Sequence, residues 1–142
     1  MRNDYELPSI ETLTRLTSKV SNIGDDSFLK NVYLNIDDER QKSCFLLIDE
    51  VYVKPMLQYH GGSVYGKAIN DAAGSLAKTV LGFMVVSLFG GPKFLYRMLP
   101  VQGLTTDFLF EQTNYVIGKI RQNGGNPVAI ICIGNRVNQS FF

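Results

Sequence analysis

The feature that most constrains this chain is the run Phe45-Leu46-Leu47-Ile48-Asp49-Glu50, in which four apolar residues lead directly into two carboxylates. A short continuous apolar run predicts a buried strand. Such a strand carries an acid into or beside the core, where an ionised carboxylate without a partner is costly. Several metal-dependent nucleases and NTPases hold Mg²⁺ with an acid on a central strand. The role of this run therefore depends on which partners the rest of the chain supplies.

The composition is that of an ordinary globular domain. The chain has 142 residues, of which 45% are hydrophobic and 19% charged, and its formal net charge is +1. This length fits one domain with a real core. The near-neutral balance gives no overall sign of nucleic-acid binding, although a local basic face remains compatible with it.

Compartment and membrane signals are few. Cys44 and Cys132 lie in apolar, strand-like runs without zinc-site spacing, which predicts buried thiols in a reducing compartment. The first six residues are polar and acidic, unlike a signal peptide. The longest apolar run, Val80 to Phe89, is too short to span a bilayer, so we expect no membrane association.

Residues 1–43 are predicted to form a helical segment in front of an α/β region covering residues 44–142. The first helix follows Leu7-Pro8-Ser9, and the second starts at Asp25 or Asp26 after Gly24. Both have apolar residues at helical spacing. These are Ile10, Leu13, Leu16 and Val20 in the first helix, and Phe28, Leu29, Val32, Tyr33 and Ile36 in the second.

The α/β region has the order strand, strand, strand, helix, strand. Strands are predicted over 44–53, 79–88, 94–101 (ended by Pro100) and 128–133, with a hairpin over 56–66 around Gly61-Gly62. The second and third strands should pair antiparallel across Gly90-Gly91-Pro92. A helix starting at Thr106 or Asp107 and ending at Asn123 connects the last two strands, which implies a mixed sheet with a parallel pair. The wholly apolar last strand has the pattern of one covered on both faces.

A P-loop NTPase is one candidate. The segment 61–68, Gly-Gly-Ser-Val-Tyr-Gly-Lys-Ala, nearly matches G-x-x-x-x-G-K-[ST]. However, Ala68 replaces the hydroxyl that would touch Mg²⁺, and the segment falls in a hairpin that follows the acidic strand. The sequence therefore disfavours this candidate.

A metal nuclease is the second candidate. Two-metal cleavage of a phosphodiester needs several carboxylates that converge from neighbouring elements. Asp49 would be the first, and the second should lie at the end of the last strand, where the sequence has Cys132-Ile133-Gly134-Asn135. His60, the one histidine, has no Cys or His neighbours in sequence and is predicted to be a surface residue.

From about Leu7 onward, the chain resembles the RNase H-like region of P-element-type transposases, which include the THAP-domain transposases of animals. The resemblance rests on an ordered set of motifs rather than on one signature. It comprises Leu7-Pro8-Ser9 with Thr12-Leu13, the acidic strand Leu47-Ile48-Asp49-Glu50-Val51, the strands around Pro92 and Pro100, and Gly124-Gly125 to Cys132 followed by Gly134 and Asn138.

The resemblance implies DNA cleavage and strand transfer by three carboxylates that hold Mg²⁺, with DNA as partner and the nucleus as location. Asp49 matches the first catalytic and metal-binding position, whereas Ile133 occupies the second. The third acid would follow an insertion that binds guanine nucleotide in the family; that insertion, the third acid and the family's amino-terminal zinc module are absent from this sequence. The chain stops at Ser140-Phe141-Phe142, which has the pattern of a helix cut off in its first turn.

We therefore expect an incomplete RNase H-like α/β fold preceded by two short helices and derived from a transposase. We expect it to be catalytically inactive, because the isoleucine at the second metal-binding position offers no ligand to Mg²⁺. The alternative is a domesticated, non-enzymatic protein- or DNA-binding module whose exposed sheet edge and terminal phenylalanines recruit a partner. An active enzyme is the third possibility.

Individual side chains have structural explanations as well. Asp49 could be a structural acid satisfied by the backbone or by Lys54, and Glu50 should point to the opposite face of a regular strand. The basic residues Lys93, Arg97, Lys119, Arg121 and Arg136 are interpreted as solvated, because a DNA-backbone role would require them to converge. The core candidates among the aromatic residues are Phe83, Phe89, Phe94, Phe108 and Phe110.

Overall fold

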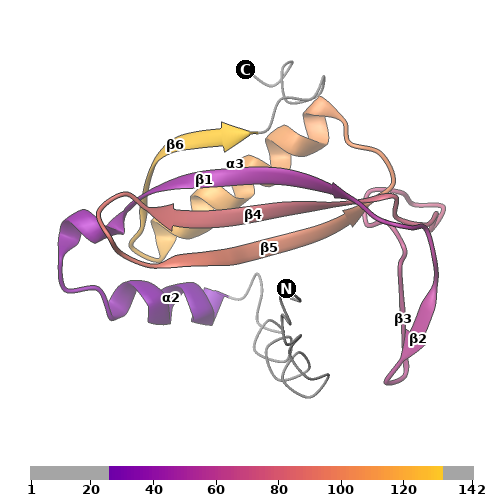
Figure 1. Cartoon of the computed structure of the whole chain (residues 1–142), viewed down its shortest axis with the longest axis horizontal. Helices are drawn as coiled ribbons and strands as arrows, with labels where there is room; N and C mark the ends of the chain where they lie inside the picture. Colours follow the sequence, from indigo (N-terminus) through magenta and orange to yellow (C-terminus); the bar gives the residue numbers. More distant parts are fainter. Residues whose placement is uncertain (1–25, 133–142) are drawn as a thin grey trace, which may run out of the picture.

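The computed structural model describes residues 26–132 of the chain. A four-stranded sheet forms the centre, two helices lie against one of its faces, and a small separate hairpin extends from one end (Figure 1). The predicted first helix, Ile133, Arg136 and the terminal phenylalanines lie outside the described residues.

The sheet is mixed and is built around strand β1 (Ser43–Tyr52). β1 pairs antiparallel with β4 (Thr79–Ser87) and parallel with β6 (Asn126–Cys132), while β5 (Lys93–Val101) pairs antiparallel with β4. The strand order is therefore β5-β4-β1-β6. This arrangement confirms the predicted mixed α/β sheet with one parallel pair and the antiparallel pairing of β4 with β5.

Helix α3 (Thr106–Gln122) carries the chain from β5 at one edge of the sheet to β6 at the other. The side chain of Thr105 caps it by accepting a hydrogen bond of 3.3 Å from the Phe108 N–H. Gly124, with a φ of +101°, follows its carboxyl end. The predicted bounds of this helix are confirmed. Its buried residues are Leu109, Val116 and Ile120, and also Thr113, which an apolar pattern does not reveal.

Helix α2 (Asp26–Leu34) packs into the same core as the sheet through Leu29 and Tyr33. The ring of Phe28 meets Phe94 of β5 edge-on, with 5.3 Å between the ring centroids. A short 3₁₀ helix, η2 (Glu39–Lys42), then leads into β1. The predicted second helix is thereby confirmed, and it lies on the same side of the sheet as α3.

The core lies between the sheet and the two helices. Along β1 the buried residues alternate with half-buried ones: Cys44, Leu46 and Ile48 face the helices. Phe83 and Tyr96 are the largest fully buried side chains among the described residues. At Tyr96 the register of β5 against β4 shifts, because β5 contains one extra residue opposite Phe83 and Met84.

Several predictions about burial are wrong. Phe89 and Phe110 are exposed, because the first lies in the β4–β5 turn and the second on the solvent side of α3. β6 is not covered on both faces by the described residues: it forms an edge of the sheet, and Val128 and Ile131 are exposed. Pro100 does not end β5 but pairs with Val80 within it, which an edge strand tolerates.

The predicted hairpin is confirmed as β2 (Gln58–His60) and β3 (Ser63–Tyr65). Gly61 and Gly62 connect them with φ values of +57° and +82°, which glycine adopts without strain. The glycine-rich segment before Lys67 is therefore a hairpin rather than a strand-to-helix loop. This was the predicted structure that disfavoured a P-loop NTPase.

Within residues 26–132, neither helix is long and apolar enough to cross a membrane.

Two glycines provide a matched test of this packing. A β-carbon at Gly125 would lie 2.5 Å from Ile120 Cγ2 and 2.5 Å from Tyr33 Cζ, whereas one at Gly118 would meet nothing within 4 Å. We predict that Gly125→Ala lowers the free energy of unfolding by about 1–3 kcal/mol through overpacking. Gly118→Ala, within α3, should instead raise it by about 0.5–1 kcal/mol. Urea denaturation followed by circular dichroism measures both, and equal effects of the two changes would contradict the packing of α2 against Gly125.

Candidate functional site

The candidate site is centred on Asp49, near the carboxyl end of the central strand β1. Because side chains alternate along a strand, Asp49 lies on the face of the sheet opposite the helices, together with Leu47 and Val51. Glu50 lies next to it on the helix-facing side, where its register partner is the buried Leu81. The predicted separation of the two carboxylates on opposite faces is therefore observed.

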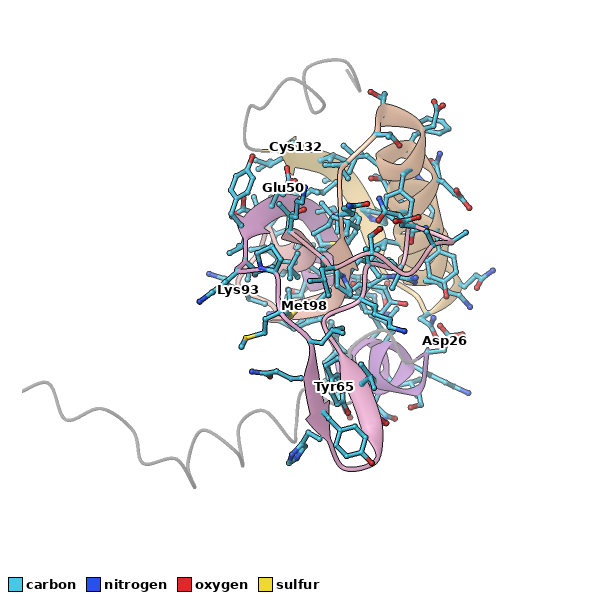
Figure 2. The ribbon with its side chains drawn as sticks, turned by 90° about the vertical axis from the view of Figure 1, so that its right-hand side faces the viewer. Asp26, Glu50, Tyr65, Lys93, Met98 and Cys132 are labelled. Carbon is cyan, nitrogen blue, oxygen red and sulfur yellow. The ribbon has the colours of Figure 1, made fainter. Side chains whose placement is uncertain are left out.

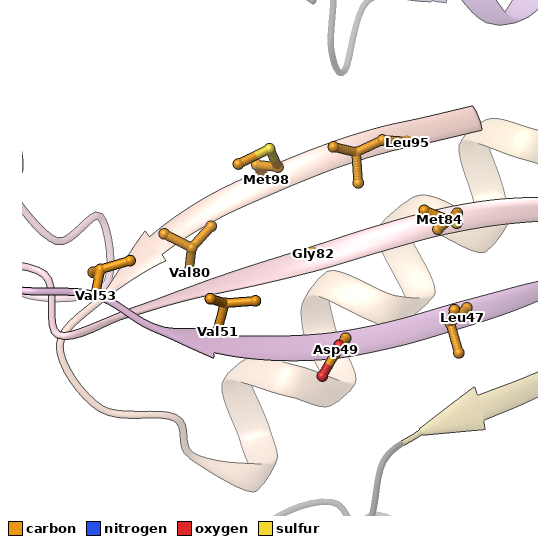
Figure 3. A pocket seen from close by; sticks show the side chains of 9 residues that line it. All are labelled: Leu47, Asp49, Val51, Val53, Val80, Gly82, Met84, Leu95 and Met98. Carbon is orange, nitrogen blue, oxygen red and sulfur yellow. The ribbon is translucent and has the colours of Figure 1, made fainter. Parts of the chain in front are cut away.

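Asp49 lies in a hollow of about 340 Å³ on the open face of the sheet (Figure 3). Three strands and Val53, which follows β1, form this hollow, and Asp49 is the one charged residue in it among those that the structure describes. The lining residues are Leu47, Asp49, Val51, Val53, Val80, Gly82, Met84, Leu95 and Met98. The site is thus a single carboxylate in an apolar surface.

Gly82 on β4 is the residue directly opposite Asp49 in the antiparallel pairing. Because glycine has no side chain, nothing from β4 covers the carboxylate at this point, and Figure 3 shows the gap between Val80 and Met84. Gly82 is not among the site residues predicted from the sequence. An isolated glycine within a valine-rich strand is the signal that could have found it, since it often marks a close approach or an open site.

The carboxylate of Asp49 has few polar contacts. Its Oδ1 accepts a hydrogen bond of 2.7 Å from the backbone N–H of Glu50. The ion pairs among residues 26–132 are Arg40–Asp38, Lys42–Glu39 and Lys119–Asp26, so the proposed contact between Asp49 and Lys54 is not formed. A backbone contact was one of the two expected for Asp49 as a structural acid. Within this part of the chain, however, no cation balances the charge of its carboxylate.

The end of β6 reaches the neighbourhood of Asp49. In the parallel pairing Cys132 is opposite Ile48, one residue before the acid. Burial raises the pKa of the Cys132 thiol, which disfavours the thiolate that a metal would need. The next residue in the sequence, Ile133, lies outside the described residues.

The described residues do not fit a Mg²⁺ site. Mg²⁺ demands near-octahedral coordination by oxygen ligands. Within residues 26–132 there is no group of three or more His, Cys, Asp or Glu side chains that could hold a metal ion. Asp49 alone supplies carboxylate oxygen in the hollow.

Two of the basic residues converge, contrary to their interpretation as separate solvated side chains. The guanidinium of Arg97 lies over the ring of Tyr115 on α3, with Cζ 4.4 Å from the ring centroid, and Lys119 Nζ lies 5.6 Å from the same centroid. Lys119 also donates a hydrogen bond of 2.8 Å to Asp26, which raises the pKa of the lysine. The bulge at Tyr96 turns Arg97 toward the helix. This cluster joins α2, α3 and β5 on the face opposite Asp49.

The remaining candidates are dispersed. Lys93 and Arg121 are exposed at separate places, and His60 is exposed in the hairpin, as predicted. Both cysteines are free. Cys44 is buried beside Tyr33, with 3.9 Å between Sγ and the phenol oxygen, and burial raises the pKa of its thiol.

The fold has a solved counterpart. A chain of the Drosophila P element transposase strand transfer complex matches with a TM-score of 0.63 and 23% sequence identity. The match covers 95% of this chain and 28% of that chain, so this chain spans less than a third of the transposase's length. This likeness shows that the two share the RNase H-like fold, and it confirms the predicted fold class.

No curated protein matches the sequence. A family model does: the model described as "TNP-like, RNase H N-terminal domain" matches residues 25–142, which is most of the chain. The chain therefore belongs to the TNP-like family, with the RNase H N-terminal domain that this model describes.

Proposed function

We propose that this chain is a transposase-derived DNA-binding domain that retains the first acid of the active site, Asp49, and does not cleave DNA by itself. The observation that carries the proposal is the placement of Asp49. It lies on the central strand of an RNase H-like sheet, on the open face, beside the end of the parallel strand β6. The proposal includes descent from a P-element-type transposase of the THAP-domain type, and action on DNA in the nucleus.

The surroundings of Asp49 favour a functional origin over a structural one. A structural acid in an apolar surface is expected to be paired with a cation or held by several donors. Among residues 26–132, Asp49 receives one backbone hydrogen bond, from its own neighbour, and is otherwise surrounded by apolar side chains. Residues that cost stability without an evident local gain are typical of functional sites.

The proposal that cleavage is lost rests on the sequence at the end of β6. Catalysis by two metal ions needs carboxylates from neighbouring elements to clamp both ions. The residue that follows Cys132 is Ile133, whose side chain has no oxygen to offer. Asp49 alone then cannot assemble the pair of ions, so Mg²⁺ is proposed to have no functional role in this chain.

A second candidate function is that of a non-enzymatic protein-binding module. The exposure of Val128 and Ile131 on β6 favours it, because an edge strand with apolar side chains is a template for a partner strand. Size-exclusion chromatography with light scattering distinguishes it: a defined dimer that Val128→Lys abolishes supports this candidate, and a monomer at high concentration contradicts it.

If Asp49 is a retained functional acid, its removal should not harm the fold. We predict that Asp49→Val, which suits a strand and the apolar hollow, raises the free energy of unfolding by up to about 1 kcal/mol. Asp49→Asn, which keeps the oxygen that accepts the Glu50 N–H, serves as the isosteric control and should be near neutral. Urea denaturation measures both. A loss of more than about 1 kcal/mol in both variants would show that the carboxylate is structural.

The loss of cleavage is tested with supercoiled plasmid DNA. Incubation with the purified chain in Mg²⁺ or Mn²⁺ should produce no more nicked circles than incubation with the Asp49→Ala variant or with buffer. Metal-dependent nicking that disappears in Asp49→Ala would overturn the proposal. A positive control with a commercial nicking enzyme verifies that the DNA is a competent substrate under the same conditions.

A further inference from the structure

After β1 the chain leaves the sheet and forms the hairpin of β2 and β3, which extends away from the rest of the molecule (Figure 1). We name residues 51–67, which comprise the last two residues of β1 and the segment that follows, the arm. Every residue from 51 to 65 is exposed. Figure 2 shows the hairpin projecting from the body, with Tyr65 on it. The arm is therefore accessible from its start through the hairpin.

The exposed side chains of the arm are unusually aromatic and apolar. Tyr52, Tyr59 and Tyr65 are 82%, 76% and 55% exposed, and Met56, Leu57 and Val64 are also exposed. Two strands of three residues cannot build a core of their own, so the hairpin gains little from these residues by itself. So many exposed apolar and aromatic side chains in one short segment indicate a binding partner.

The charge of the arm identifies the kind of partner. From residue 51 to residue 70 the sequence contains no aspartate or glutamate, although the whole chain has 13 acids against 14 lysines and arginines. Lys54 and Lys67 are both exposed, and His60 precedes the Gly61-Gly62 turn. Lysines neutralise phosphates, and tyrosine rings stack on bases. The combination of exposed tyrosines, lysines and no carboxylate fits a nucleic acid.

The arm also lies next to the hollow that contains Asp49. β1 runs from Asp49 directly to the arm at Val51, and Val51 and Val53 line the same hollow as Asp49. DNA that lay with its backbone beside Asp49 would therefore meet the arm next. In the hairpin Tyr59 pairs with Val64 and Tyr65 pairs with Gln58, so the two tyrosines lie on opposite faces of the hairpin. Each face thus presents one ring.

We infer that the arm is a DNA-binding hairpin, in which Lys54 and Lys67 contact the phosphate backbone, and Tyr59 and Tyr65 stack on bases of DNA that continues from Asp49 along the arm. This inference rests on the proposed function, because it takes DNA as the molecule that the domain binds. It adds the arm as a binding surface and assigns phosphate contacts to the lysines and base stacking to the tyrosines. It also implies that the DNA runs from Asp49 toward the hairpin.

The experiment measures binding of a fluorescein-labelled duplex with a short single-stranded tail, by fluorescence anisotropy, in EDTA at several NaCl concentrations. The tail offers unpaired bases and the duplex offers phosphates. The double variant Lys54→Gln/Lys67→Gln should bind more weakly and reduce the slope of log K against log salt by about 1.4–1.8, since each phosphate contact contributes about 0.7–0.9. Tyr59→Ala/Tyr65→Ala should weaken binding by roughly tenfold or more with an unchanged salt slope, because stacking is not electrostatic.

Matched controls lie outside the arm. Lys93→Gln removes an exposed lysine at the start of β5, and Phe110→Ala removes an exposed aromatic ring on α3. Both should bind like the wild type. The urea midpoint of every variant verifies that it is folded, which the exposure of the altered side chains favours.

The outcomes separate the two proposals. If the wild type binds the probe and the arm variants bind equally well, the arm inference is overturned and the proposed function stands. If the folded wild type does not bind the probe, the proposed DNA-binding function itself is overturned. Arm variants that change the oligomeric state but not DNA binding would identify the arm as a protein interface and overturn the inference.

Discussion

The alternation of side chains along β1 is the constraint on which the rest of the structure depends. β1 is hydrogen-bonded on both sides, antiparallel to β4 and parallel to β6, so its register is fixed from two directions. A slip by one residue would exchange the two faces of the strand. It would bring Asp49 into the core in place of Ile48, which is fully buried. The core and the position of the acid are thus determined by the same pairing.

Much of this fold could be predicted from local sequence. The ends of α3, the Gly61-Gly62 turn and the bounds of β1 and β4 follow from capping residues, from glycine conformation and from apolar runs, and these act within a few residues. Burial was harder to predict. Phe110 has the same chemistry as the half-buried Phe108, and which of them faces the sheet depends on how α3 is rotated in the folded chain.

The candidate site was likewise predicted from the sequence only in part. The presence of an acid on a central strand was visible in the sequence of β1 alone. The hollow around it was not, because its walls come from three strands, β1, β4 and β5, that meet only through pairing. The open position left by Gly82 depends on the register of β4 against β1. The convergence of Arg97 and Lys119 on Tyr115 likewise depends on a bulge that no local pattern announces.

The two edge strands of the sheet, β5 and β6, differ in where their regular pairing is interrupted. At β5, Pro100 has no N–H to donate, the extra residue at Tyr96 interrupts the ladder, and the carbonyl of Pro100 already accepts a hydrogen bond of 2.9 Å from the Ile69 N–H. β6 is also interrupted, by Pro127 and by the extra residue Val128, but this irregularity lies at the start of the strand, and residues 129–132 pair regularly with β1. An added strand therefore meets a regular stretch at β6, next to the strand that carries the acid, and an interrupted one at β5.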